Sequence, residues 1–138
     1  MSPVRMSFAM VGLMLAAVTS FSARAHHSFG FYDMQKTVEV RGTVRKFEWS
    51  NPHSWLFIEV SSATGPITYG FEMQSVGEML RRGWAKNSVK PGDRITVSFH
   101  PMKDGSPNGL LVSAKGENDK LIGKPPPLPP PAAAIPGG

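Results

Sequence analysis

The segment 38–47 constrains the fold of this chain most strongly, because its side chains alternate in character and a glycine stands in its middle. Alternation with a period of two is typical of a β-strand with one buried face. One face would carry Val38, Val40, Gly42, Val44 and Lys46, and the other Glu39, Arg41, Thr43, Arg45 and Phe47. Gly42 has no side chain to pack and often marks a bulge or a sharp bend in a strand. It therefore predicts the bend that a long strand needs in a small barrel.

Four further segments are rich in β-branched and aromatic residues and predict strands. They are 54–60, 67–73, 94–100 and 110–115. Turn-forming residues separate several of them, because proline and glycine interrupt regular structure. These breaks are Ser50-Asn51-Pro52, Thr64-Gly65-Pro66 and the "KPGD" of residues 90–93.

One short helix is predicted between the third and fourth strands. Ser75 and Glu78 have the spacing of a capping box, in which a serine and a glutamate bind the free amides of a helix start. An apolar stripe at helical spacing follows, made of Val76, Met79 and Leu80. Gly83 stands where a helix-terminating glycine belongs.

Three strands, one helix and two strands follow one another in the order of the five-stranded Greek-key barrel called the OB-fold. An open α+β sheet is the main alternative, but a long first strand with a central glycine favours a barrel. We therefore predict a mainly β protein with an OB-like barrel over residues 38–117.

The two ends of the sequence have different compositions from the middle. Arg5, the apolar run 6–17 and Ala23-Arg24-Ala25 form the pattern of a signal peptide cut after Ala25. The apolar run is shorter than the roughly 20 residues of a membrane-spanning helix. We expect residues 1–25 to be removed, leaving an arm (26–37) and no membrane span in a periplasmic or secreted protein; a retained N-terminal anchor is the alternative.

The region 118–138 ends in a proline-rich stretch, "KPPPLPPPAAAIPGG". Proline at this density favours extended polyproline II structure and opposes helices and sheets. We expect a disordered tail that acts as a spacer, or else as a ligand for a proline-binding partner.

The overall composition narrows the classes of function. The chain contains no cysteine, which excludes disulfides and thiolate metal ligands. Its formal net charge is +5, falling by two when the signal peptide leaves, and its basic residues are scattered. We therefore expect no nucleic-acid partner. Motifs for nucleophilic, metalloprotease or phosphate chemistry are missing from the sequence, so a non-enzymatic binding protein is the favoured class.

The four histidines are the strongest candidates for a binding site. Cleavage after Ala25 would make His26 the first residue, followed by His27, and a terminal histidine offers its α-amine and imidazole to one ion. His53 and His100 fall in or beside the two connections that frame the ligand face of an OB-fold. Nitrogen ligands of this kind suit copper or zinc, and Met102 adds a soft thioether for Cu(I). The alternative is that these histidines only form hydrogen bonds within loops.

Aromatic residues around the first loop suggest a different site. Trp49, Trp55 and Asn51 could hold a sugar, another small organic ligand or an envelope protein partner, because exposed aromatic rings on such a face stack on flat ligands. The alternative interpretation is that Phe47, Trp49, Trp55 and Phe57 mainly fill the core of the barrel.

Several stretches together resemble a known family of small exported bacterial proteins, domain of unknown function 6152. They are "HHSFGFYD", "GTVRKFEWSNPHSW", "LRRGWAKNSVKPGD" and "KDG". The resemblance covers about His26 to Lys115 and leaves out the proline-rich tail. It implies an exported domain marked by the double histidine, Asn51-Pro52-His53 and Arg82-Gly83-Trp84. It implies no particular activity, substrate or cofactor.

Overall fold

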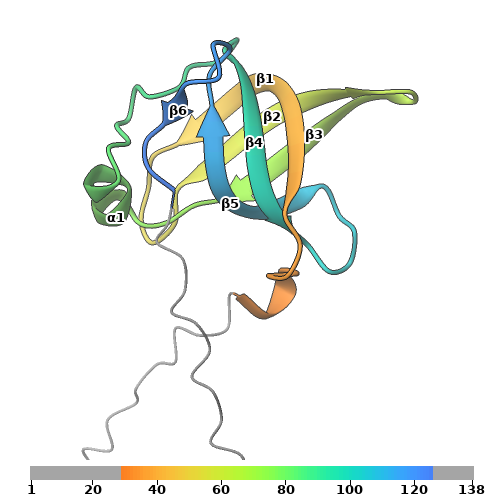
Figure 1. Cartoon of the computed structure of the whole chain (residues 1–138), viewed down its shortest axis with the longest axis horizontal. Helices are drawn as coiled ribbons and strands as arrows, with labels where there is room; N and C mark the ends of the chain where they lie inside the picture. The colour runs from red at the N-terminus through yellow and green to blue at the C-terminus, as the bar shows by residue number, and fades with distance from the viewer. Residues whose placement is uncertain (1–28, 126–138) are drawn as a thin grey trace, which may run out of the picture.

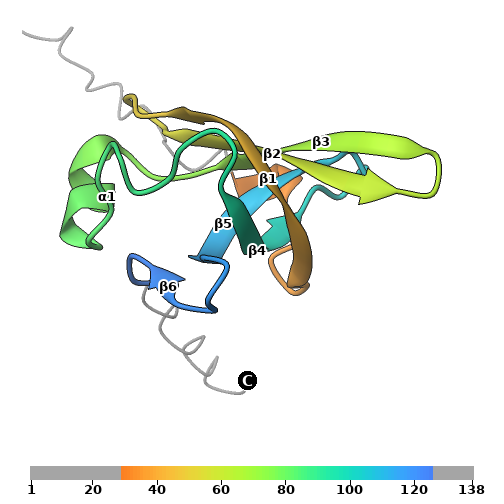
Figure 2. The same cartoon turned by 90° about the horizontal axis from the view of Figure 1, so that it is seen from above.

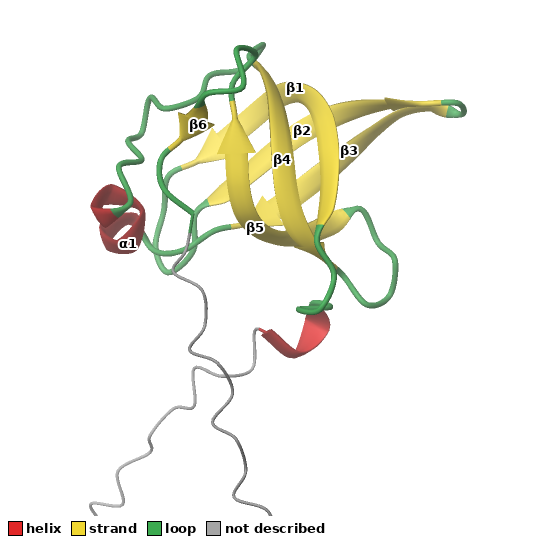
Figure 3. Cartoon of the chain, in the orientation of Figure 1, coloured by secondary structure: helices red, strands yellow, loops and turns green. Residues whose placement is uncertain are grey.

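The computed structural model describes residues 29–125 as strands with two short helical segments (Figures 1 and 3). The elements are η1 (Phe29–Phe31), β1 (Val38–Glu48), β2 (Trp55–Ser62), β3 (Gly65–Glu72), α1 (Val76–Arg81), β4 (Arg94–Pro101), β5 (Asn108–Lys115) and β6 (Leu121–Ile122). The predicted order of three strands, one helix and two strands is confirmed. None of the helices in this range has the length and apolar character that crossing a membrane requires.

The first five strands form a closed barrel. Antiparallel neighbours run in the order β3-β2-β1-β4-β5, and a parallel pairing of β3 with β5 joins the two ends. Helix α1 lies at one side of the barrel, and the tip of the β2–β3 hairpin extends from the opposite side (Figures 1 and 2). The prediction of an OB-like barrel is therefore confirmed, and the open α+β sheet is not adopted.

Strand β1 takes part in both halves of the barrel, and Gly42 lies where it changes partner. Its first half pairs with β4 from Val38 to Thr43, and its second half pairs with β2 from Thr43 to Glu48. A Cβ atom at Gly42 would lie 2.4 Å from the carbonyl oxygen of Glu59. Only glycine permits this approach, so the predicted bend has a direct steric cause.

The alternation predicted for 38–47 is wrong at its end. The register between β1 and β2 shifts between Val44 and Lys46, which makes Arg45 the extra residue of a β-bulge. Phe47 consequently pairs with Leu56, a fully buried residue, and packs against the same core as Val44. A bulge changes the parity of a strand, and strict alternation contains no signal for it.

The core fills the barrel and continues beneath α1. Its largest fully buried side chains are Phe71, Leu56, Ile58, Met73, Met79, Ile95, Val44 and Val97. Trp84 follows α1 and is 3% exposed, with its ring 5.9 Å from that of Phe47. Trp84 therefore packs the helix region against the mouth of the barrel.

The start of α1 shows the serine half of the predicted capping box, and its end is closed as expected. The Ser75 hydroxyl accepts a hydrogen bond from the amide of Glu78 at 3.4 Å, while the Glu78 carboxylate binds Arg81 and Arg82. At the other end Gly83 has a φ of +79°, and the Trp84 amide donates to the carbonyl of Met79 at 3.0 Å. This is the Schellman arrangement, in which a glycine in the left-handed region ends the helix.

The turn predicted at Thr64-Gly65-Pro66 lies slightly earlier in the chain. Ala63 and Thr64 form the turn, and Gly65 already belongs to β3 with a φ of +117°. The Ser62 hydroxyl accepts from the Thr64 amide at 3.3 Å and closes the turn.

Regular structure also continues into the region assigned to the tail. Strand β6 pairs with β5 through Ile122 and Ala114. A Cβ atom at Gly123 would lie 2.2 Å from the Trp84 ring, and the Lys124 amide donates to the Arg82 carbonyl at 2.8 Å. Residues 121–124 therefore contact the barrel and the end of α1, beyond the limit of 117 predicted for the domain.

Candidate functional site

The segment from Phe29 to Lys36 folds back onto the barrel, at the end of β4 (Figure 1). We call this segment the docked arm. The amide of Asp33 donates to the Pro101 carbonyl at 2.8 Å, and the amide of Lys103 donates to the Phe31 carbonyl at 2.9 Å. Between these bonds Tyr32 forms an isolated β-bridge with Met102. The docked arm is thus held by backbone bonds in the manner of a short added strand.

A buried carboxylate lies under the docked arm. Glu72 is at the end of β3 and only 8% exposed. The phenol of Tyr32 donates to its Oε2, and Nδ1 of His53 lies 3.1 Å from its Oε1. Tyr32 itself is 5% exposed. A tyrosine from the arm and a histidine from the β1–β2 loop therefore meet on the two oxygens of one carboxylate.

The β1–β2 loop is fixed so that His53 faces this carboxylate. Buried Ser54 donates from its hydroxyl to the Ser50 carbonyl at 3.2 Å and from its amide to the Gln74 carbonyl at 3.1 Å. Asn51 accepts the Val76 amide on its side-chain oxygen at 3.0 Å. Asn51, predicted as a ligand-binding residue, thus ties the loop to the start of α1.

Burial raises the pKa of the Tyr32 phenol above its ordinary value of 10.0, and the hydrogen bond to Glu72 and the negative charge of that carboxylate raise it further. Each of these effects disfavours the phenolate. Tyr32 therefore remains a hydrogen-bond donor throughout the physiological pH range.

This raised pKa predicts a change in stability at alkaline pH. A tyrosine with a higher pKa in the folded state stabilises the fold fully below pH 10, and the contribution is lost as the pH rises towards the folded pKa. The slope is about 1.4 kcal/mol per pH unit for one proton. Tyr32→Phe should lack this pH dependence of the free energy of unfolding, because phenylalanine has no phenol to ionise. Urea unfolding of the unaltered chain and of Tyr32→Phe from pH 8 to pH 11 measures the difference. Equal pH dependence in both proteins would contradict the assignment.

His100 holds the other end of the docked arm. Its Nδ1 lies 2.7 Å from the carbonyl oxygen of Lys36, and Nδ1 of His53 lies 3.2 Å from the carbonyl of Met73. Carbonyl and carboxylate oxygens only accept, so Nδ1 carries the proton in both rings. In the neutral imidazoles Nε2 then holds the free lone pair, which is the form that binds metals.

His100 lies in the same outer row of the barrel as Glu72, the carboxylate beside His53, but two strands away from it. Across the strands Trp55 pairs with Glu72, Glu72 with Leu110, and Leu110 with His100. Neighbouring strands are about 4.8 Å apart, so two strand spacings separate Glu72 from His100. His53 lies near the phenol of Tyr32, through Glu72, whereas Met102 pairs with the backbone of Tyr32.

The structure describes three of the five predicted metal ligands, His53, His100 and Met102. His26 and His27 lie outside the described residues, and His27 is joined to Phe29 through Ser28 alone. Within residues 29–125 no group of three or more His, Cys, Asp or Glu side chains could hold a metal ion.

The aromatic residues divide between core and surface. Trp49 packs edge-on against Phe47, with ring centroids 5.6 Å apart, and both are partly buried against the core. Trp55 and Phe57 stack nearly parallel, 6.2 Å apart and 17° inclined, and both remain half-buried. They lie on β2 in the same outer face as Glu72. Trp49 and Trp55 are both half-buried, Trp49 against the core and Trp55 on the face of Glu72, and their role in ligand binding stays a prediction.

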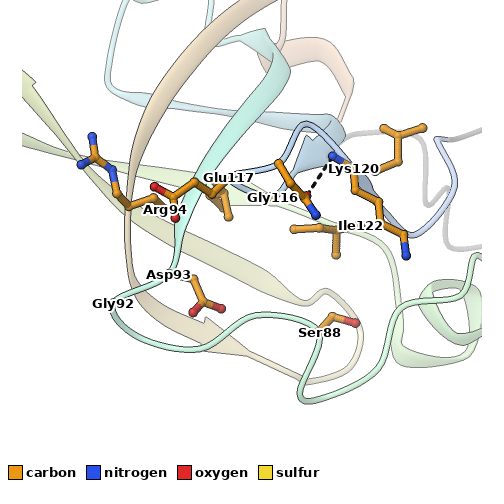
Figure 4. A pocket seen from close by; sticks show the side chains of 11 residues that line it. Ser88, Gly92, Asp93, Arg94, Gly116, Glu117, Lys120 and Ile122 are labelled. Carbon is orange, nitrogen blue, oxygen red and sulfur yellow. Dashed lines mark hydrogen bonds between the residues drawn. The ribbon is translucent and has the colours of Figure 1, made fainter.

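A separate hollow of about 480 Å³ lies beyond the start of β4 (Figure 4). The loop before β4 and the β5–β6 connection form its walls, with Asp93, Arg94 and Glu117 among its polar lining residues. The Lys120 amide donates to the Asn118 side chain at 3.2 Å, drawn as the dashed line (Figure 4). None of the predicted site residues lines this hollow.

Tyr32 and Glu72 are not among the site residues predicted from the sequence. Tyr32 belongs to the "HHSFGFYD" stretch, which was a usable signal for the arm. Glu72 alternates with inward-facing Phe71 and Met73, so the pattern predicts an exposed outer residue. It is buried because the docked arm covers it, and the strand pattern contains no information about that cover.

Comparison with known proteins places the chain in a family without assigning a function. No curated protein matches the chain. One family model matches residues 14–113, which include the docked arm, all of β1–β4 and most of β5. The chain therefore belongs to the family of unknown function DUF6152.

Proposed function

We propose that this protein is exported, processed after Ala25, and binds copper or zinc through the new N-terminus and His53. The supporting observation is the close approach of Nδ1 of His53 to Oε1 of buried Glu72, at 3.1 Å, beside the Met73 carbonyl at 3.2 Å. Metal-binding histidines commonly donate their second ring N–H to a carboxylate, which fixes the ring and makes the free nitrogen more basic. The side chain of His53 is 45% exposed, so the barrel does not enclose its ring.

The other ligands would come from the start of the processed arm. The docked arm carries Tyr32 to the same carboxylate that holds His53. Only Ser28 separates His27 from the first residue of that arm. The α-amine and imidazole of His26, with Nε2 of His53, would supply three nitrogens, a set that suits Cu(II) and also Zn(II). His100 and Met102 offer the second combination, with a thioether suited to Cu(I).

The test is a metal titration of the processed protein. The chain is exported, its N-terminal sequence is determined, and it is titrated with Cu(II) and Zn(II) by calorimetry. We expect one ion per chain, and a more than roughly 10-fold loss of affinity in His53→Ala, because a ligand counts for more than its hydrogen-bonding partner. An added N-terminal methionine should weaken binding similarly, because His26 then loses its free amine.

His100→Ala is the comparison variant, because His100 holds the other end of the docked arm through its own Nδ1. We expect a smaller loss of affinity than in His53→Ala, since His100 positions the arm and does not bind the ion. If His100→Ala loses affinity and His53→Ala does not, the third metal ligand is His100 and not His53. If the unaltered chain binds no tighter than the methionine-extended His53→Ala protein, metal binding is not its function.

The second proposal is a metal-free module that holds a small organic ligand, a sugar or a partner protein. The stacked and half-exposed pair of Trp55 and Phe57 supports it, since flat rings on this face of an OB-fold are common binding platforms. A panel of monosaccharides and aromatic acids would then quench tryptophan fluorescence in the presence of a chelator. Quenching that persists in Trp55→Ala would rule out this surface.

A further inference from the structure

The docked arm and the two histidines are connected by side-chain bonds at both ends of the arm. His100 donates to the arm at the Lys36 carbonyl, and Tyr32 of the arm reaches His53 through Glu72. We propose that Glu72 couples docking of the arm to metal binding at His53, with Tyr32 and Glu72 as positioning residues. The inference rests on the proposed function and adds a role for two residues that do not bind the metal.

The geometry of Glu72 makes this coupling direct. Each of its two oxygens serves a different segment, with Oε2 accepting from the arm and Oε1 facing the β1–β2 loop. The carboxylate is 8% exposed, so water gives it little alternative solvation. A carboxylate in such surroundings depends on its protein donors, and losing one leaves a poorly satisfied charge.

The His53 ring is the most exposed member of this chain of contacts. Its side chain is 45% exposed, whereas Tyr32 and Glu72 are buried. A metal on Nε2 would fix the plane of the ring and keep Nδ1 between the Met73 carbonyl at 3.2 Å and Oε1 of Glu72 at 3.1 Å. A fixed Oε1 places Oε2 beneath the Tyr32 phenol, so the metal and the arm favour the same arrangement of Glu72.

Coupling of this kind must act in both directions. If the docked arm raises the affinity for metal, the metal must stabilise the docked arm by the same factor. The amides of Asp33 and Lys103 report docking, because they bond across the contact between arm and barrel at 2.8 and 2.9 Å. Their hydrogen exchange should therefore become slower when zinc binds.

Tyr32→Phe and Glu72→Gln are the decisive variants. Phenylalanine keeps the packed ring and removes the donor. Glutamine keeps the shape, but its single oxygen can accept from only one of the two partners. In Zn²⁺ titrations of the exported, processed chain we expect both variants to bind about 10- to 100-fold more weakly, the usual effect of losing a partner behind a ligand.

Matched controls come from the same barrel. Tyr69→Phe alters a half-buried tyrosine beside Phe71 and Phe99, and Glu39→Gln alters an exposed carboxylate bonded to Ser98 at 3.2 Å. Both should bind zinc like the unaltered chain. Thermal unfolding of each variant verifies that the barrel is intact at the titration temperature.

Amide exchange separates coupling from a purely structural role. Zinc should slow exchange at Asp33 and Lys103 in the unaltered chain and have much less effect in Glu72→Gln. A folded Tyr32→Phe protein with unchanged zinc affinity, or zinc-independent exchange at both amides of a zinc-binding chain, overturns the coupling and leaves the proposed function standing. Failure of the unaltered chain to bind any zinc or copper overturns both.

Discussion

Replacing Phe71 with alanine is expected to lower the free energy of unfolding by about 3–5 kcal/mol, the usual cost of deleting a buried phenylalanine ring. Phe71 is fully buried at the centre of the barrel. Its ring lies 4.9 Å from that of Phe99 and 6.1 Å from that of Tyr69. These rings come from β3 and β4, so a cavity here removes contacts between strands on different sides of the barrel. Urea unfolding followed by tryptophan fluorescence measures the loss.

Phe57→Ala is the matched control, since it deletes the same ring from the outer face of β2. Phe57 is only half-buried and stacks on Trp55. We expect less than half the loss seen for Phe71→Ala, because a partly exposed ring gives up less buried area and leaves no enclosed cavity. Equal losses in the two variants would mean that the interior of the barrel is not the main source of stability.

Gly42→Ala is expected to be the most disruptive single methyl group that can be added to β1. Its Cβ would lie 2.4 Å from the Glu59 carbonyl oxygen and 3.0 Å from the carbonyl carbon, and neither is a flexible side chain that can move aside. Overpacking costs roughly 1–3 kcal/mol, and a clash with backbone lies at the upper end of that range. The loss is measured by thermal or urea unfolding.

Gly77→Ala provides the contrasting result within the same protein. Gly77 lies in α1, and the nearest atom to an added Cβ is 3.8 Å away on the flexible Arg81 side chain. Alanine is favoured over glycine in helices by up to about 1 kcal/mol, so this variant should be slightly more stable than the unaltered chain. If Gly42→Ala were equally harmless, Gly42 would not be the point where β1 has to bend.

Local patterns in the sequence predict most of the barrel, because each strand is marked by its own alternation and its own turns. Gly42, Ser75 and Gly83 each perform the predicted task. The errors arise where geometry depends on another strand. The bulge at Arg45 turns Phe47 inward because β1 must follow β2 there, and no feature within 38–47 reveals that constraint.

The candidate site is less accessible to sequence reasoning, because it depends on contacts between distant segments. Topology correctly suggests that His53 and His100 belong to the same outer region of the barrel. Their Nδ1 partners could not be predicted, since these are Glu72 from the next strand and a backbone carbonyl of the arm. Tyr32 and Glu72 are 40 positions apart, and only the folded arm brings them together.

The closed barrel also determines when the arm can dock during folding. The parallel pair brings Phe71 beside Gly109, and β1 begins by pairing with Phe99, so closure depends on contacts between distant parts of the sequence. Chains dominated by such contacts fold slowly, in milliseconds to seconds. The arm bonds to Pro101 and Lys103, which reach their positions only when β4 and β5 are in place. Docking of the N-terminal segment should therefore be among the last folding events. A chain that has just emerged from synthesis would hold Glu72 without its Tyr32 donor from the arm.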